Sequence, residues 1–350
     1  SKSNAQILEY LRELRSQGKV EVKRVRLILV GNGNTGKSTL VKRLREDSFD
    51  ETAAIMTDGI DISQVTLQGV DMTVFDFAGQ SEYEHTHSLF FDDQAVFLLL
   101  YCPRSGGMDR LQAFLNMIQN CAPQAEIILV TTRCHEAVLD DIEREFIMAL
   151  SPRIVACHAI DSKYGTGIPA LVQSIVQVAL DKPSTVKRIP RSFDNLQQQI
   201  SEYGRSRFSI TVSELEKLCS LRQLHISSAM RELALSLFLD WGYVHRLSNG
   251  DIVLRPQQLA NVMACMFTKV ESKQSRIGDV HEGVLRHTDK VLDAVWAEEF
   301  PDLDKHMWRC SVDRPISPFL QLLYQAGLAF ELFDPSGKPV GASLVPALLP

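Results

Sequence analysis

The residues best suited to chemistry form a glycine-rich loop, GNGNTGKS, at 31–38. It fits the spacing G-x-x-x-x-G-K-[ST], follows an apolar run and opens a segment with helical periodicity. Such a loop turns its backbone N–H groups inward around phosphate oxygens, and the positive end of the following helix strengthens that attraction. Lys37 is placed to reach the β- and γ-phosphates of a nucleotide, and Ser38 to bind Mg²⁺. The predicted nucleotide-binding residues here are Gly31, Asn32, Gly33, Asn34, Thr35, Gly36, Lys37, Ser38 and Thr39.

A second motif, DFAGQ, occupies 76–80, at the end of the apolar run TVFDF. In P-loop proteins an acid at this place holds the metal ion, usually through water, which predicts Asp76 as a metal ligand. Gly79 is placed to offer its N–H to the γ-phosphate, and Gln80 to orient the attacking water. Together with Lys37 and Ser38, these residues predict phosphoryl transfer to water.

Thr57 lies between the two motifs, in MTDGIDI at 56–62. A mobile threonine there is predicted to close over the γ-phosphate and complete the Mg²⁺ shell. A plain turn residue before a strand at 61–67 is the alternative interpretation. The predicted catalytic residues are Lys37, Thr57 and Gln80, and the predicted metal ligands are Ser38, Thr57 and Asp76.

The elements that must position these side chains alternate between strand and helix. Short apolar runs typical of buried strands recur at 26–31, 73–77, 95–101, 126–131 and 153–157. Segments with helical spacing lie between and after them, at 37–46, 107–120, 138–150 and 166–180. This alternation predicts an α/β fold of the P-loop, Ras-like kind with a mostly parallel sheet. Ligands of such sheets bind at the carboxyl ends of the strands, where both motifs fall.

The second half of the chain has a different pattern. A polar, proline-bounded stretch at 182–190 predicts a linker. Helical patterns at 191–203, 212–220 and 226–240 precede two alternating runs around Ser-Asn-Gly, which predict a hairpin. That order is typical of a winged-helix module, and further helical patterns follow at 256–268, 281–298 and 315–327. The predicted organisation is an N-terminal helix at 1–22, a nucleotide domain at 23–181, the linker at 182–190 and an α+β module at 191–350.

Composition limits the classes of partner. The net charge is −6, and the helical pattern at 226–240 has Arg231 as its one basic residue, so we expect no nucleic-acid binding. No apolar run approaches the roughly 18 residues of a membrane span, and no signal segment opens the chain, so we expect no membrane insertion. Seven scattered cysteines without C-x-x-C spacing favour free thiols in a reducing cytoplasm.

Several stretches together resemble the Roco family, which includes the leucine-rich-repeat kinases. The stretches GNGNTGKS, TDGIDI, DFAGQSEYEHTHSLFF and AVFLLLY look like its Roc GTPase domain. KRIPRSFDNL, FLDWGYVHRLSNGDIVLRPQQLANVM and SLVPALLP are similar to the N-terminal half of the COR domain that follows Roc. The resemblance implies binding and hydrolysis of GTP with Mg²⁺, a GDP-bound state, relay of the nucleotide state to COR, protein partners and a homodimer formed through COR.

The stretch VTTRCHE at 130–136 departs from that resemblance. Guanine-specific domains have here an aspartate that accepts two N–H groups from the base, whereas this chain has His135. A neutral imidazole offers one acceptor nitrogen, and a protonated one offers none. Arg133 is still able to lie over a base. The base-contacting residues are predicted as Thr132, Arg133, His135 and Ala159.

Two other functions remain open on the sequence. The altered base loop favours a non-catalytic scaffold that acts through contacts of COR, or a nucleotide site without base preference. The complete set of Lys37, Ser38, Thr57, Asp76 and Gln80 favours the GTPase.

Overall fold

The computed structural model describes residues 2–46, 59–79, 88–103, 108–136, 139–247, 250–267, 280–281, 284–286, 324 and 329–344. Thr57 and Gln80 lie outside these ranges. The chain divides into two compact units, and each is treated separately. The sheet unit comprises Leu14–Pro190 and Ser236–Gly242, and the helical unit comprises Ser1–Glu13, Arg191–Leu235 and Tyr243–Pro350.

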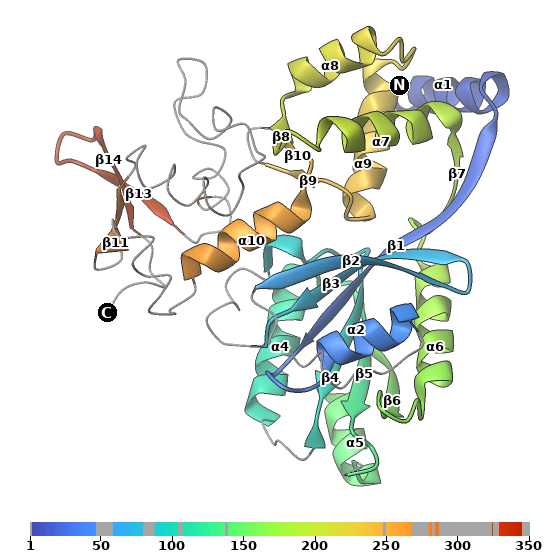
Figure 1. Ribbon diagram of the computed structural model, residues 1–350, viewed down its shortest axis with the longest axis vertical. Coiled ribbons are helices and arrows are strands. Elements are labelled where there is room, and N and C mark those ends of the chain that lie inside the picture. The colour runs from blue at the N-terminus through green and yellow to red at the C-terminus, as the bar shows by residue number, and fades with distance from the viewer. Residues whose placement is uncertain are drawn as a thin grey trace. The chain divides into compact units, whose positions relative to one another are not determined.

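A seven-stranded sheet forms the centre of the sheet unit (Figure 1). Its strand order is β2-β3-β1-β4-β5-β6, and β7 pairs with the N-terminal part of β1. Strands β3, β1, β4, β5 and β6 run parallel to one another, while β2 pairs antiparallel with β3 and β7 pairs antiparallel with β1. The mostly parallel sheet that the sequence predicts is therefore confirmed. The strands are β1 (Lys19–Gly31), β2 (Ile60–Leu67), β3 (Val70–Phe77), β4 (Val96–Tyr101), β5 (Glu126–Thr132), β6 (Ile154–Ile160) and β7 (Val186–Pro190).

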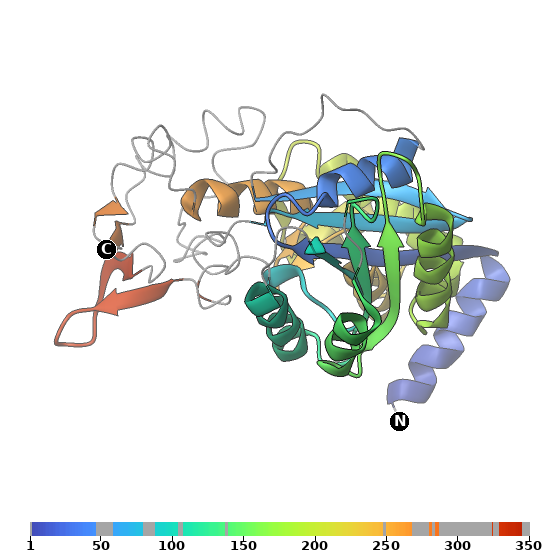
Figure 2. The same ribbon diagram turned by 90° about the horizontal axis from the view of Figure 1, so that it is seen from below.

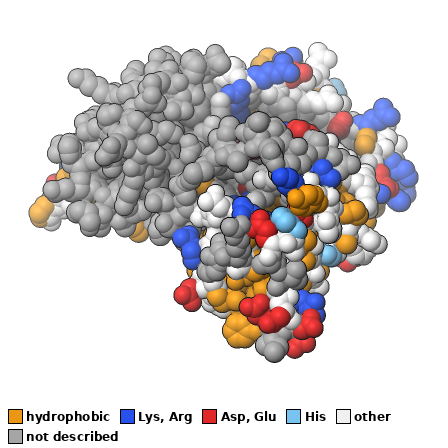
Figure 3. All heavy atoms as spheres, turned by 60° about the horizontal axis from the view of Figure 1, so that its bottom comes forward, with side chains coloured by type: hydrophobic (Ala, Val, Ile, Leu, Met, Phe, Trp, Pro, Cys, Tyr) orange, Lys and Arg blue, Asp and Glu red, His pale blue; other side chains and the backbone are white. Residues whose placement is uncertain are grey.

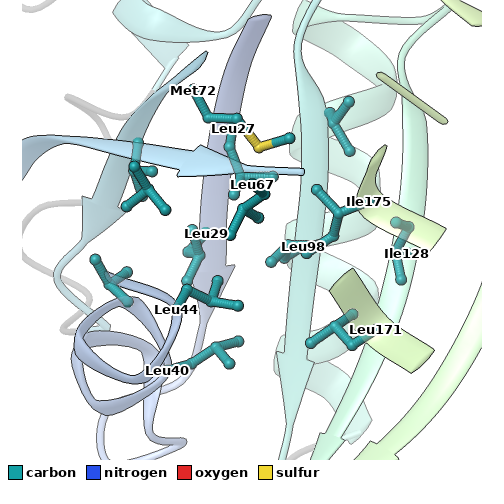
Figure 4. Close-up of a cluster of buried hydrophobic side chains, with 14 of the residues drawn as sticks. Leu27, Leu29, Leu40, Leu44, Leu67, Met72, Leu98, Ile128, Leu171 and Ile175 are labelled. Carbon is teal, nitrogen blue, oxygen red and sulfur yellow. The ribbon is translucent and has the colours of Figure 1, made fainter. Parts of the chain in front are cut away.

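Helices cover both faces of this sheet (Figure 2). Because side chains alternate along a strand, Leu27 and Leu29 of β1 lie on one face. There they join a buried cluster with Leu98 of β4, and with Leu40 of α2 and Ile175 of α6 (Figure 4). Strands this apolar need cover on both faces, which their helices provide. The helices of this unit are α2 (Lys37–Glu46), α4 (Met108–Cys121), α5 (Asp141–Ala149) and α6 (Ile168–Asp181), with a short 3-10 helix η3 (Ser88–Phe90).

The opposite face carries an aromatic cluster that reaches toward the second motif. The Phe75 ring lies 5.6 Å from that of Phe90, and Phe91 lies 5.6 Å from Phe77 and 4.9 Å from Phe97. Phe75 and Phe77 belong to β3, which ends next to Ala78 and Gly79. The cluster therefore joins the strand before the second motif to the residues that follow Gln80 in the chain.

The predicted linker at 182–190 is instead part of the sheet. β7 pairs with Lys19–Lys23 of β1, and Ile189 is fully buried. The buried Lys182 donates to the carbonyl of Asp93 and pairs with Glu126. Polar, proline-bounded composition suggests a linker, but pairing with a distant strand satisfies this backbone. The N-terminal helix, predicted over 1–22, is α1 (Lys2–Ser16), and β1 follows from Lys19.

The helical unit has the expected order of helices followed by a hairpin. Its short strands form a three-stranded sheet in the order β8-β10-β9. The rings of Tyr10 in α1 and Phe193 in α7 lie 6.1 Å apart in a tilted arrangement. A capping box between Thr211 and Glu214 begins α8. The elements are α7 (Arg191–Tyr203), β8 (Ser209–Ile210), α8 (Val212–Leu221), α9 (Ser228–Asp240), β9 (His245–Arg246), β10 (Ile252–Val253) and α10 (Pro256–Phe267). The winged-helix interpretation fits this order and stays a prediction.

A four-stranded antiparallel sheet follows, in the order β11-β12-β14-β13. Helical spacing predicts a helix over 281–298, but Val284–Arg286 forms β12 and pairs with β14. Pairing with a strand far along the chain outweighs local periodicity in so short a segment. The strands are β11 (Val280–His281), β12 (Val284–Arg286), β13 (Phe330–Phe333) and β14 (Pro339–Leu344).

Candidate nucleotide site

Lys37 lies at the centre of the glycine-rich loop. Its side chain is buried, with 6% of the residue exposed, and its Nζ donates to the carbonyl oxygens of Gly31 and Asn32, each at 2.8 Å. Burial lowers the pKa of Lys37 to about 8; the charge of Asp76 opposes that shift, and the charge of Arg110 adds to it. The loop thus wraps around a partly desolvated ammonium group.

The loop conformation depends on residues that tolerate positive φ. Gly31 has φ 147°, Asn34 63° and Gly36 87°. A Cβ at Gly31 would lie 2.3 Å from the carbonyl oxygen of Leu100, so the close approach of β1 to β4 requires glycine here. Thr35 donates from its hydroxyl to the Asn32 carbonyl at 2.9 Å, and this bond fixes the loop just before α2 begins.

The second motif meets this loop directly. Asp76 is buried near the end of β3, in register with Leu29 of β1. Three residues later, the carbonyl oxygen of Gly79 accepts a hydrogen bond from the backbone N–H of Gly33 at 3.0 Å. A Cβ at Gly79 would lie 2.2 Å from the Gly33 nitrogen, so a glycine is required at this contact as well. In this conformation Gly79 presents its carbonyl oxygen to the loop, and the contact of its N–H with a phosphate stays a prediction.

The predicted metal ligands have the chemistry that Mg²⁺ prefers. Ser38, in the first turn of α2, supplies a hydroxyl oxygen, and Asp76 supplies a buried carboxylate. Mg²⁺ takes about six oxygen ligands and is usually held by one or two protein groups together with phosphates and water. The donor set therefore fits this ion. The third predicted ligand, Thr57, and the predicted catalytic Gln80 are outside the described residues.

The loop after β5 is joined to the glycine-rich loop. Arg133 has φ 56° and donates from Nη2 to the carbonyl oxygen of Asn34 at 3.4 Å. Thr132 ends β5 and is buried. The structure therefore brings Thr132 and Arg133 to the same edge of the sheet as the phosphate loop, as the sequence predicts.

His135 contacts Asp161, an acid that the sequence motifs do not predict as part of the site. Its Nδ1 contacts Oδ2 of Asp161, and its ring meets Tyr164 edge to face at 5.1 Å. The Asp161 side chain is 3% exposed, and its Oδ1 accepts the backbone N–H groups of Lys163 at 2.9 Å and of Tyr164 at 3.0 Å. Asp161 is the first residue after β6, and an acid just past an apolar run and before Gly165 was the available signal.

Ala159 is not part of this loop. It lies within β6, paired with Thr131 of β5, and the loop that meets His135 spans 161–166. The sequence places the end of the strand a few residues too early, which shifts the predicted contact from the loop into the strand. Acidic, basic and histidine side chains are interspersed on the surface at this end of the sheet unit (Figure 3).

Comparison with known proteins shows which protein family the nucleotide-site region resembles. Residues 26–135 match the family described as Ras of Complex, Roc, domain of DAPkinase. The probable serine/threonine-protein kinase pats1 of Dictyostelium discoideum is 25% identical over 390 residues, which cover 98% of this chain and 11% of that protein. The Ras-related protein Rab-26 of Rattus norvegicus is 30% identical over 110 residues, which cover 30% of this chain and 43% of that protein. The chain thus spans only a part of these relatives.

The fold of both halves has a solved counterpart. The structure of Methanosarcina barkeri Roco2 RocCORdC bound to GDP covers 95% of this chain and 98% of its own, with a TM-score of 0.71 and 18% identity. At that identity the likeness concerns the fold. Residues 26–135 of this chain thus match a Roc domain, and the fold of the chain is similar to that of the Roco2 RocCOR structure, in agreement with the resemblance of its motifs.

Proposed function

We propose that this chain is a guanine-nucleotide switch that binds GDP and GTP with Mg²⁺, hydrolyses GTP and relays its nucleotide state to the module that follows. The observation that carries the proposal is the position of Lys37. Its ammonium lies buried inside a glycine-rich loop at the start of a helix, with a pKa lowered to about 8 mainly by burial. A phosphate group supplies further negative charge and hydrogen-bond acceptors to this buried ammonium and to the N–H groups of the loop.

Each predicted site residue has one role in the proposed reaction. Lys37 stabilises charge on the β- and γ-phosphates, and backbone N–H groups of the loop surround them. Ser38 and Asp76 hold Mg²⁺, which neutralises charge that develops on the phosphate oxygens. Gln80 orients the water for in-line attack, and Thr57 closes over the γ-phosphate. In this scheme the chain provides positioning and charge, as phosphoryl transfer requires.

The relay is supported by an arginine inside the sheet unit. Arg26 of β1 is buried, and its Nη1 donates to the carbonyl oxygen of Phe90 at 2.9 Å. Its Nη2 donates to the carbonyl oxygen of Leu239. Phe90 follows the segment that contains Gln80, and Leu239 lies in the last turn of α9. A shift of the segment after Gln80 would therefore act on the end of α9 through a single side chain.

The C-terminal end of α9 and Trp241 just after it are packed within the sheet unit. Trp241 is 1% exposed, and its Nε1 donates to the carbonyl oxygen of Ser184 at 3.2 Å. The Arg24 guanidinium lies 5.2 Å from the centre of the Trp241 rings. Residues 236–242 group with the sheet unit, whereas the preceding turns of the same helix group with the helical unit. The proposed relay therefore acts on residues 236–242, the part of α9 that belongs to the sheet unit.

Single-turnover phosphate release from GTP tests the enzymatic part of the proposal. The wild-type chain with Mg²⁺ should release phosphate, and Lys37→Ala should lose both nucleotide binding and release. Lys42→Ala removes the same charge from the same helix without touching the loop, and it should behave as wild type. Equal release by Lys37→Ala and wild type would contradict the assignment of the phosphate site.

The proposed function also includes a location in the cell and binding partners. None of the helices within the described ranges is long and apolar enough to span a bilayer. We place the chain in the cytoplasm, with protein partners and homodimer formation through the C-terminal module. Sedimentation of the GDP-bound and GTP-analogue-bound chain at several concentrations tests the dimer.

His135 favours a second candidate function. Because an imidazole replaces the base-binding carboxylate, the chain would then act as a scaffold that binds nucleotide without base preference or catalysis. Absence of phosphate release, together with equal affinity for guanine and adenine nucleotides, would support that candidate.

A further inference from the structure

The contact between His135 and Asp161 determines which atoms remain to meet a base. Asp161 is nearly buried, and its Oδ1 already accepts two backbone N–H groups, from Lys163 and Tyr164. Its Oδ2 faces Nδ1 of His135. Since a carboxylate can only accept, Nδ1 carries the hydrogen of this contact. In the neutral ring, Nε2 is then left with its lone pair.

The position of Nε2 suits a ligand held by the phosphate loop. The His135 side chain is 41% exposed, whereas that of Asp161 is 3% exposed, so the imidazole is open to a ligand beside a nearly buried acid. Arg133, two residues earlier, donates to Asn34 of the phosphate loop. Both loops lie at the carboxyl ends of parallel strands of one sheet, β1 and β5, which are separated by β4. Ligands of such sheets bind at these ends. The second acid beside the His135 ring is Glu136. Its Oε1 lies 3.5 Å from Nε2, which is longer than a good hydrogen bond.

We propose that the His135–Asp161 pair determines base preference, with Asp161 orienting the ring and His135 Nε2 accepting a single N–H from a 6-oxopurine. This inference rests on the proposed nucleotide-binding function and deepens it. The N1–H of the base is the shared donor of guanine and hypoxanthine, and it is more acidic than the exocyclic amine. The 2-amino group of guanine then adds no hydrogen bond to this pair. Adenine has an acceptor at N1, so it leaves Nε2 unpaired.

The expected order of affinities follows from this count of hydrogen bonds. GDP and IDP should bind within about threefold of one another. ADP should bind several-fold more weakly, because an unpaired acceptor is left in the site. A carboxylate at position 135 would instead accept two N–H groups from guanine, and GDP would exceed IDP by about tenfold or more.

A substitution at position 135 alone does not create that carboxylate site. His135→Asp sets two carboxylates against each other, because Asp161 stays in place and is nearly buried. The double variant His135→Asp/Asp161→Asn removes the conflict. The amide oxygen keeps the two backbone N–H bonds of Lys163 and Tyr164, and the amide nitrogen donates to the new carboxylate. The double variant should therefore bind GDP more tightly than the single variant does.

Calorimetric titration with GDP, IDP and ADP, each with Mg²⁺, tests the proposal on the full chain. Wild type should show equal GDP and IDP affinity and weaker ADP affinity, and the double variant should prefer GDP over IDP by about tenfold or more. Asp161→Asn alone should narrow the difference between IDP and ADP, since the ring is then free to turn. Glu145→Gln, at an exposed position of α5, is the matched control and should leave all three affinities unchanged.

The outcomes separate this proposal from the function on which it rests. A wild-type preference for GDP over IDP of about tenfold would mean that a group with two acceptors contacts the base, and it would overturn the proposal alone. ADP affinity equal to that for IDP would overturn it as well. Failure of all three nucleotides to bind would overturn both the proposed function and this inference.

Discussion

The backbone N–H of Gly33 donates a hydrogen bond to the carbonyl oxygen of Gly79 across 3.0 Å. The phosphate loop and the second motif are thus in direct contact. A loop N–H that turns toward a phosphate must release this bond. In the proposed function, nucleotide binding would act on the second motif through this bond, as a switch requires.

Gly79→Ala tests that coupling. The added Cβ would lie 2.2 Å from the Gly33 nitrogen, so we expect the nucleotide-free chain to lose about 1–3 kcal/mol of unfolding free energy. The bound form should lose less, because the Gly33 N–H then faces phosphate. Thermal unfolding with and without saturating GDP should show a larger GDP-dependent rise in Tm for the variant than for wild type. An equal rise would mean that the Gly33–Gly79 contact persists when nucleotide binds.

Gln80→Leu separates catalysis from binding. The side chain is predicted to position the water, a task that involves neither the base nor the α-phosphate. We expect the single-turnover rate to fall by about a hundredfold, the usual cost of a misplaced reactant, while GDP affinity stays constant. Gln112→Leu, at a half-buried glutamine of α4 whose side chain donates to Asn116, is the control and should change neither. An unchanged rate in Gln80→Leu would show that another group orients the water.

Arg26→Met tests the relay. The change keeps a long apolar side chain but removes the donors to Phe90 and Leu239, so the two carbonyl groups lose their partner. We expect a loss of about 2–4 kcal/mol in unfolding free energy. Hydrogen exchange of residues 236–242 should differ between the GDP and GTP-analogue states in wild type and much less in the variant. Arg188→Met, an exposed arginine of β7, should keep the wild-type difference; the relay is wrong if Arg26→Met keeps it too.

Asp240 predicts a pH dependence of stability. Burial and, to a smaller extent, the nearby charge of Asp92 raise the pKa of Asp240, while Arg26 and Lys187 act in the opposite direction, and the resulting pKa is about 6. The folded state therefore binds more protons than the unfolded state between about pH 4 and pH 6. This contribution to stability is complete below the unfolded pKa, and it is lost as the pH rises through about 6.

The variant Asp240→Asn should remove that slope. We expect it to gain about 1–2 kcal/mol relative to wild type at pH 7.5, after allowance for partial exposure, and little at pH 4. Urea unfolding at both pH values measures the difference. Asp61→Asn, on the exposed side of β2, should show no such dependence. A gain of the same size at both pH values would point to a cause other than ionisation.

Local sequence determines the phosphate site well and the base site poorly. The residues from Gly31 to Ser38 are contiguous, so their spacing alone indicates the loop. Asp161 lies 26 residues from His135, and only the pairing of β5 with β6 brings them together. In the same way, β7 was expected to be a linker, because its partner β1 lies more than one hundred residues earlier. Features made by distant pairing are not encoded in local periodicity.

Nucleotide binding by the Gly31–Ser38 loop is the property on which the proposed function most directly depends. Calorimetric titration of the full chain with GDP and Mg²⁺ measures this, with Lys37→Ala and Lys42→Ala titrated in parallel. We expect saturable binding by wild type and Lys42→Ala, and none by Lys37→Ala. Binding of equal strength in all three, or no binding by wild type, would contradict the assignment of the site.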